Sequence, residues 1–122
     1  MAKSDNIEVL VIQWLKTWVG NDWPVSAEKK KTPPAKYILV ERTGGPRESM
    51  VMDRAEILIE VYHKTSKLDA SNKANAIGDR IKELLEYNDD ITRAVVNSTV
   101  PLDDLIGQYR RYQVYCDIYH RR

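Results

Sequence analysis

Apolar residues in the first part of the chain recur at the spacing of one helical face. Within residues 5–19 they are Ile7, Leu10, Val11, Trp14, Leu15 and Trp18. This spacing predicts a helix over residues 5–19, capped by Asp5 and ended by Gly20-Asn21-Asp22. Val9, Ile12 and Val19 lie off that face, so the apolar surface is wider than one contact with a sheet requires. We expect either a neighbouring subunit or the next loop to cover the excess.

Two segments in the middle of the chain have the composition of β-strands. Residues 36–43 and 54–63 are rich in β-branched and aromatic residues. In the second segment Ile57, Ile59 and Val61 share one face, while the residues between them share the other. We expect these two strands to pair antiparallel, joined by a long loop over residues 43–53.

The remaining periodic segments complete the predicted set of elements. Residues 67–86 place apolar side chains three and four positions apart, which predicts a second helix. Residues 94–100 and 109–119 are predicted strands, and the second of these alternates strictly between two faces. Residues 23–27 are a candidate short edge strand, because Pro24 at its start is tolerated there.

This order of elements defines a fold class. We expect one domain over residues 1–122, of the α+β class. Its mostly antiparallel sheet would have about four to five strands, with the two main helices packed on one face.

Composition and net charge narrow the classes of function that this protein can have. The 19 Lys and Arg residues nearly balance the 18 Asp and Glu residues, so the net charge of +1 gives no general attraction to nucleic acid. The single cysteine excludes an internal disulfide framework, and no apolar run is long enough to span a bilayer. With no signal peptide at the start, we expect synthesis in the cytoplasm. Seven Tyr and three Trp with no Phe suit surfaces that become half-buried on association.

Candidate catalytic and metal-binding residues are few. The two histidines, His63 and His120, stand at strand ends without further Cys or His at metal-ligand spacing, so no metal is expected there. Cys116 lies in mid-strand with apolar same-face neighbours, which indicates packing. Gly44-Gly45 lacks the Gly-Lys-Ser/Thr of a phosphate loop, and a turn needing positive φ is the favoured interpretation.

Acidic residues leave one enzymatic alternative open. A small metal-dependent nuclease would need carboxylates that converge on a cation. The acidic candidates are Asp53-Arg54 and Asp89-Asp90, and Asp53 could act together with Glu60 on one strand. A basic groove would accompany such a site, or would indicate a nucleic-acid-binding protein. Ion pairing and a solvated strand face are the favoured roles of these two carboxylates.

Three short motifs carry a resemblance to a known family. Arg42-Thr43-Gly44-Gly45 ends one apolar strand, Asp53-Arg54-Ala55 opens the next, and Arg111-Tyr112-Gln113 begins the closing strand. In this order they resemble the tail terminator proteins of long-tailed siphophages, particularly those of phages that infect actinobacteria. The order of elements agrees across nearly the whole chain, although the N-terminal helix matches only by its pattern.

The resemblance implies a structural function with no catalytic residue, cofactor or metal. Tail terminators form hexameric rings that cap the tail tube, stop its polymerisation and offer a surface to the head side. The implied partners are further copies of this chain, the tail tube protein and a head-tail connector protein. The implied location is the head-proximal end of the tail, with DNA passing through the ring without specific contact and no role for a membrane.

A closed ring needs two different complementary patches on each subunit. We expect one on the wide apolar face of the first helix and one on the outer face of the last strand. The loop over residues 43–53 is a third candidate contact, because loops of that length usually carry a function. The candidate interface residues are Trp14, Trp18, Arg42, Arg47, Met50, Met52, Asp53, Arg54, Tyr115 and Tyr119. A neck or head-completion connector subunit is the alternative within virion assembly.

Overall fold

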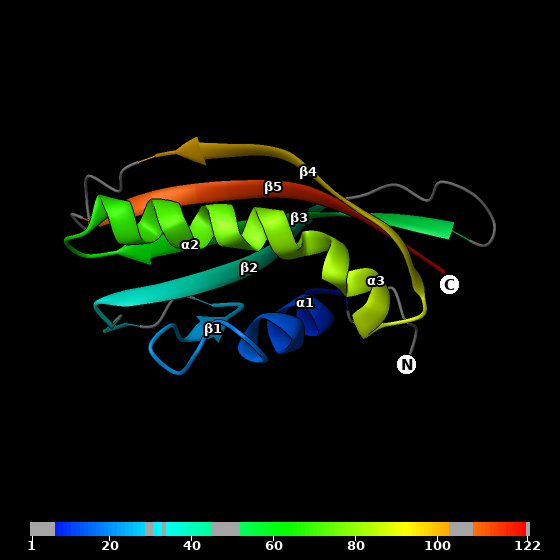
Figure 1. Ribbon diagram of the computed structural model, residues 1–122, viewed down its shortest axis with the longest axis horizontal. Helices are drawn as coiled ribbons and strands as arrows, with labels where there is room; N and C mark the ends of the chain where they lie inside the picture. The colour runs from blue at the N-terminus through cyan, green and yellow to red at the C-terminus, as the bar shows by residue number, and fades with distance from the viewer. Residues whose placement is uncertain (1–6, 29–30, 33, 45–51, 103–108, 122) are drawn as a thin grey trace.

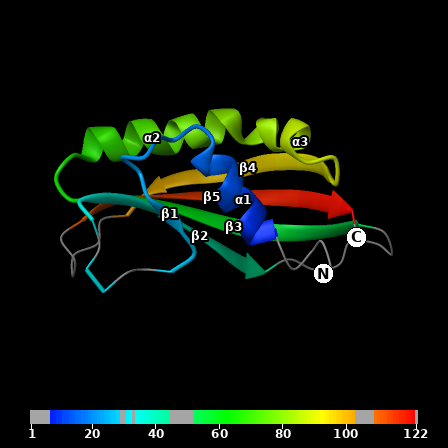
Figure 2. The ribbon, with the colours of Figure 1, turned by 90° about the horizontal axis from the view of Figure 1, so that it is seen from below.

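A computed structural model of the chain shows a five-stranded sheet with helices on one face (Figures 1 and 2). It describes residues 7–28, 31–32, 34–44, 52–102 and 109–121. In chain order the elements are α1 (Ile7–Lys16), β1 (Val25–Ser26), β2 (Lys36–Gly44), β3 (Met52–His63), α2 (Lys67–Arg80), η2 (Ile81–Glu83), α3 (Leu84–Tyr87), β4 (Ile91–Pro101) and β5 (Arg110–Arg121). The predicted α+β class and the mostly antiparallel sheet are confirmed.

The strands lie in the order β1-β2-β3-β5-β4. β1 pairs parallel to β2, and the other three pairings are antiparallel. The predicted hairpin of β2 and β3 is confirmed, with Val40 opposite Ile59, and Ile59 is in turn opposite Val114 of β5. Apolar positions of the three central strands therefore line up in rows across one face of the sheet.

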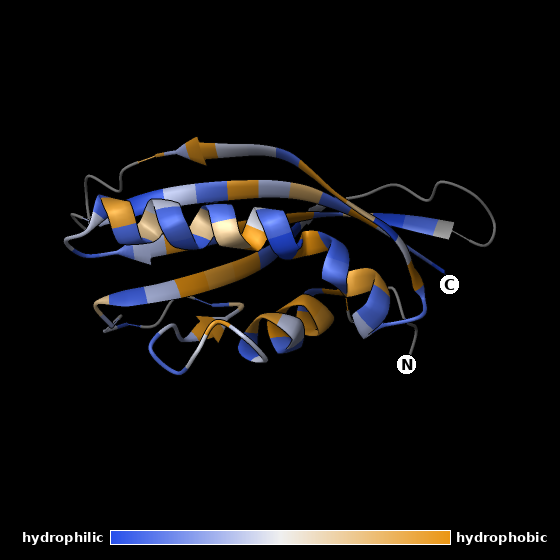
Figure 3. Cartoon of the chain, in the orientation of Figure 1, coloured by the Kyte–Doolittle hydropathy of each residue, from blue (hydrophilic) through white to orange (hydrophobic). Residues whose placement is uncertain are grey.

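The core fills the space between that face and the helices. Ile38, Val40, Ile59 and Val114 of the sheet are fully buried. α2 contributes its small residues Ala70 and Ala74 and the larger Ile77, and α1 contributes Ile7, Val11, Trp14 and Leu15. The hydropathy colouring shows the same division, with the most apolar stretches on α1 and on the sheet beneath the helices (Figure 3). Small residues on α2 let this helix approach the sheet closely.

α1 is shorter than predicted and is held at the edge of the sheet. Asp5 lies outside the described residues, and the helix ends at Lys16. The carboxylate of Glu8 accepts a hydrogen bond of 2.9 Å from the backbone N–H of Arg42. Gly20 follows with φ of 92°, a conformation that favours glycine. Val19 is only 6% exposed, so the chain itself covers part of the apolar excess.

Several elements differ from their predicted bounds, and β5 ends two residues later than predicted, at Arg121. The predicted helix over residues 67–86 is divided into α2, η2 and α3, with a break at Arg80, where φ is −101° and ψ is 1°. β4 extends the predicted strand 94–100 to Ile91 and Pro101, and proline is tolerated because β4 is an edge strand. β3 likewise begins two residues early, at Met52.

The prediction for Gly44 is wrong. This glycine does not have a positive φ; it is the last residue of β2 and pairs with Glu56 at a register shift. A Cβ here would lie 3.2 Å from the carboxylate oxygen of Glu56, a flexible side chain that could move aside. Gly45 lies outside the described residues.

Candidate assembly surfaces

The second face of the sheet is polar and aromatic, and within the described ranges no helix covers it (Figure 2). We call it the open face. It carries the alternate residues of β3 and β5: Arg54, Glu56, Leu58, Glu60, Tyr62, Arg111, Gln113, Tyr115, Asp117 and Tyr119. A sheet face of mixed aromatic and charged residues, with no described helix on it, is suited to contact with another polypeptide.

Glu60 is at the centre of a hydrogen-bonded cluster on the open face. Its Oε2 accepts from Arg111 Nη1 at 3.1 Å, from the Tyr62 hydroxyl at 3.2 Å and from Gln113 Nε2 at 3.2 Å. The side chains of Glu60 and Arg111 are only 12% and 22% exposed. Burial raises the pKa of Tyr62, so its hydroxyl remains a donor at neutral pH. The cluster is therefore a well-ordered part of this surface.

Three tyrosines form an aromatic cluster beside Glu60, separate from the hydrophobic core under the helices. The rings of Tyr37 and Tyr62 stack with centroids 4.5 Å apart, and Tyr109 meets both rings edge-on. The Tyr109 hydroxyl donates to the carbonyl of Pro34 at 2.8 Å. These contacts anchor the start of β5 to the loop that precedes β2.

Three of the predicted interface residues lie on the open face. Arg54 pairs with Glu56 at 3.2 Å and lies 4.0 Å from Asp117. Tyr115 is 37% exposed, and together with Arg54 it lines a shallow pocket of about 360 Å³. Tyr119 lies under the guanidinium of Arg93, whose Cζ is 5.5 Å from the ring centroid. The structure therefore brings Arg54, Tyr115 and Tyr119 onto one surface.

Other predicted interface residues lie on the helix side of the sheet. Trp14 is 2% exposed in the core, so it offers no surface to a partner. Trp18 is partly buried and is covered by Arg80, whose Cζ is 4.1 Å from the ring centroid. Asp53 is 8% exposed and lies opposite His120 at the end of the sheet. The spacing that placed Trp14 and Trp18 on one helical face did not show which part of that face the sheet covers.

The remaining predicted residues lie at the end of β2, at the start of β3 or in the segment between them. The Nε of Arg42 donates to the Gly44 carbonyl at 3.2 Å. Met52 begins β3 opposite Arg121. Arg47 and Met50 lie outside the described residues, so their interface role stays a prediction.

Asp53 and Glu60 do not form a joint metal site. They are seven residues apart on β3, so their side chains point to opposite faces and their backbones are about 23 Å apart. Among the residues that the structure describes, no three His, Cys, Asp or Glu side chains gather as metal ligands would. The pair named for nuclease chemistry therefore cannot converge on one cation.

The histidines and the cysteine have packing roles. His63 Nδ1 accepts from the backbone N–H of Ser66 at 2.9 Å, at the start of α2. Cys116 is 2% exposed and its Sγ lies 3.5 Å from the carbonyl oxygen of Ile57. Burial raises the pKa of the Cys116 thiol to about 12, which keeps it unreactive at neutral pH. The packing role predicted for Cys116 is confirmed.

His120 is expected to make stability depend on pH. It is 2% exposed, and burial lowers its pKa below the ordinary 6.5. Hydrogen bonding with the Arg121 backbone and the charges of Asp53 and Asp90 oppose this shift in pKa, whereas the charge of Arg42 adds to it. As the pH falls below 6.5 the unfolded chain therefore binds a proton that the folded chain does not. The free energy of unfolding should fall between pH 7.5 and 5.5 by at most about 1.4 kcal/mol per pH unit. Urea unfolding at several pH values would show this, and His120→Leu should flatten the slope; an unchanged slope would contradict the assignment.

Two features of the surface could not be predicted from the sequence because each joins distant segments. Arg111 and Glu60 lie 51 residues apart and meet only through the pairing of β3 with β5. A second feature lies beside α2, where Trp23, Lys36 and Lys73 converge from three different segments. The alternation of charge along β3 and β5 signals a polar strand face, but it does not give the partner of any residue.

Comparison with known proteins supports the fold. In sequence the chain matches no protein-family model and no curated protein. Among solved structures, a similar chain comes from the virion of a native gene transfer agent particle. The two share 11% sequence identity with a TM-score of 0.64, and the match covers 99% of this chain and 98% of that one. At this identity the likeness shows a shared fold. The described helices include none with the length and apolar character to cross a membrane.

Proposed function

We propose that this protein is a virion structural subunit, and specifically a tail terminator that closes into a ring on the end of a tail tube. The observation that carries the proposal is the fold shared with a virion chain over nearly the full length of both molecules. The motifs around Arg42, Asp53 and Arg111 add to it, because they resemble those of the terminator family.

The surfaces of the subunit suit a protein that acts by assembly. A ring forms when one patch of each copy binds a different patch of the next and the rotation closes. The open face, with Arg54, Tyr115 and Tyr119, is one such surface. In this proposal the ring is a hexamer at the head-proximal end of the tail. It meets the tail tube protein on one side and a head-tail connector on the other, and it uses no catalytic residue or cofactor.

Tails assembled without this protein provide the decisive test. Because the ring ends tube polymerisation, its loss should give tubes much longer than normal, visible by negative-stain electron microscopy. Adding the purified protein to growing tubes should restore the normal length. Tails of normal length that fail to join heads would contradict the proposal and indicate a connector subunit.

A nuclease assay with magnesium or manganese tests the enzymatic alternative. Because Asp53 and Glu60 lie on opposite faces of the sheet, neither the wild-type protein nor the Asp53→Ala variant should cleave DNA. Cleavage that depends on Asp53 would overturn the proposal.

A further inference from the structure

A small pocket with two lysines lies where the loop before β1 meets β2 and α2. It has a volume of about 320 Å³ and is lined by Trp23, Lys36, Asp69, Asn72 and Lys73. Lys36 comes from the start of β2, and Asn72 and Lys73 come from the first half of α2. We call this the lysine pocket.

The two ammonium groups of the lysine pocket approach one indole ring. Lys36 Nζ is 5.2 Å and Lys73 Nζ is 5.5 Å from the centroid of the Trp23 ring. Neither lysine forms an ion pair within the described part of the chain. Burial, followed by the charges of Lys36 and Arg80, lowers the pKa of Lys73. Two cations therefore lie within 5.5 Å of the centre of one indole ring, and neither has an ion-pair partner among the described residues.

Arg80 is a cation over an indole ring that, unlike the two lysines, also has a carboxylate partner. It covers Trp18 and also binds Glu83 through two hydrogen bonds of 2.8 and 3.0 Å. In the lysine pocket the nearest acid is Asp69, which is 57% exposed and lies 3.5 Å from His63. The pocket thus has room and charge for one further carboxylate, and the Asn72 amide provides a neutral donor.

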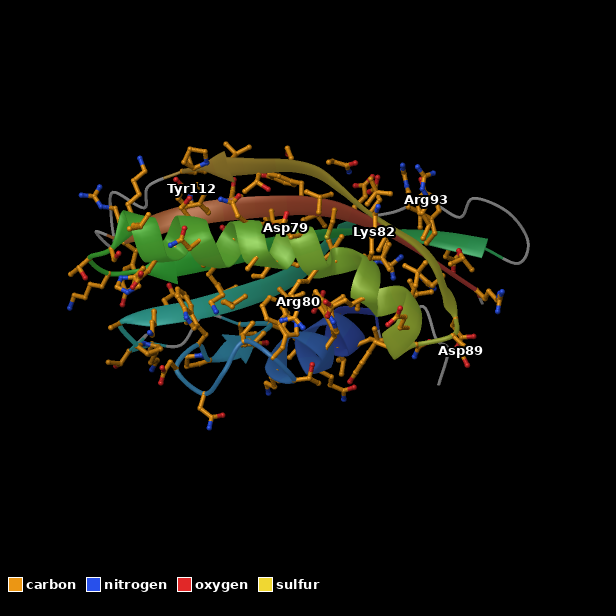
Figure 4. The ribbon with its side chains drawn as sticks, viewed as in Figure 1. Asp79, Arg80, Lys82, Asp89, Arg93 and Tyr112 are labelled. Carbon is orange, nitrogen blue, oxygen red and sulfur yellow. The ribbon has the colours of Figure 1, made fainter. Side chains whose placement is uncertain are left out.

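Exposed acidic residues lie at the other end of the helix layer. Glu86 of α3 and Asp89 of the turn before β4 are both exposed, and Figure 4 shows Asp89 at the end of the molecule away from the start of α2. Lys73 and Tyr87, the last residue of α3, are 14 residues apart along the helices, or about 21 Å, and Asp89 follows two residues later. We call residues 86–90 the acidic turn. Unlike patches at opposite ends of one subunit are what head-to-tail association requires.

We propose that the lysine pocket binds the acidic turn of the next copy, with the carboxylate of Asp89 lying between Lys36 and Lys73 and that of Glu86 outside the pocket. This contact rests on the ring-forming function proposed above and identifies one of its interfaces. Phosphate of DNA is a less suitable occupant, because two lysines beside Asp69 make a small cationic footprint, whereas nucleic-acid affinity grows with the number of phosphates neutralised.

Charge reversal tests the contact directly. Lys73→Glu or Asp89→Lys alone should weaken self-association at least about tenfold, measured by sedimentation equilibrium, because like charges then face each other. The double variant should return to within about threefold of wild type, because the pair is restored in reverse. Lys16→Glu and Asp79→Lys are matched controls at exposed positions of α1 and α2, and they should leave association unchanged.

Disulfide trapping gives an independent readout. Cys116 is buried, so a protein carrying both Asn72→Cys and Asp89→Cys has only two accessible thiols. Mild oxidation should produce a covalent ladder that stops at the ring size, whereas each single variant should give at most a dimer. Circular dichroism of every variant separates lost contact from lost folding.

The outcomes separate this contact from the ring itself. Association that is insensitive to charge reversal, with no ladder, overturns the contact but leaves ring formation intact. A monomer at all concentrations, both alone and with tail tubes, overturns both proposals. Lower affinity of Lys73→Glu for a short DNA duplex, with Asp89→Lys associating normally, assigns the pocket to phosphate and overturns the contact.

Discussion

Replacing Ile59 with alanine is expected to lower the free energy of unfolding by about 3–4 kcal/mol. Ile59 is fully buried in the central strand β3, between Val40 of β2 and Val114 of β5. The substitution leaves a cavity that neighbouring strands cannot fill, because their positions are fixed by pairing on both sides. A loss of this size is a large share of the roughly 5–15 kcal/mol that stabilises a typical domain.

Urea or thermal unfolding followed by circular dichroism would measure the effect of Ile59→Ala. The melting temperature should fall by roughly 10 °C or more. Leu68→Ala is the matched control, because Leu68 is 69% exposed and its loss should change stability by less than about 0.5 kcal/mol. Equal stability of the two variants would show that the sheet does not pack as described.

Replacing Glu60 with alanine is expected to cost about 2–3 kcal/mol. Its carboxylate accepts three hydrogen bonds, and its loss removes the anion that lies 3.1 Å from Arg111 Nη1 in a partly buried place. Arg111 Nε still donates a hydrogen bond of 3.0 Å to the Leu102 carbonyl, which limits the loss of stability. The effect exceeds that of an exposed ion pair because both side chains are mostly shielded from water.

A double-mutant cycle separates the Glu60–Arg111 contact from the other bonds of each residue. The variants Glu60→Ala, Arg111→Ala and their combination, measured in urea, should give a coupling energy above about 1 kcal/mol. Glu60→Gln is the control of matched shape, and it should lose less than Glu60→Ala because it keeps an acceptor. A coupling energy near zero would show that the cluster contributes little to folding.

Much of this fold follows from patterns within single segments. The alternation in residues 54–63 placed Ile57, Ile59 and Val61 on the core face, as the structure confirms. The same reasoning placed Cys116 with Val114 and Ile118 in the core. Such patterns succeed because burial of one face is decided locally, by a period of two residues in strands and by spacings of three and four in helices.

Features that depend on contacts between segments were not accessible to this reasoning. Trp14 and Trp18 share a helical face, yet only Trp14 is fully buried, because Arg80 of α2 covers Trp18 instead of the sheet. The polar Asp53 was expected in a contact loop, but the pairing of β3 with β5 carries it to a buried position opposite His120. The lysine pocket likewise exists only once three segments come together.

The position of β5 has a consequence for how the subunit is made. Within the described sheet, β4 pairs only with β5, so residues 110–121 are the one link between β4 and the strands β1, β2 and β3. A growing polypeptide therefore cannot complete its sheet until these residues leave the ribosome. A polypeptide that stops before residue 110 lacks half of the residues of the open face, and its β4 has no strand with which to pair.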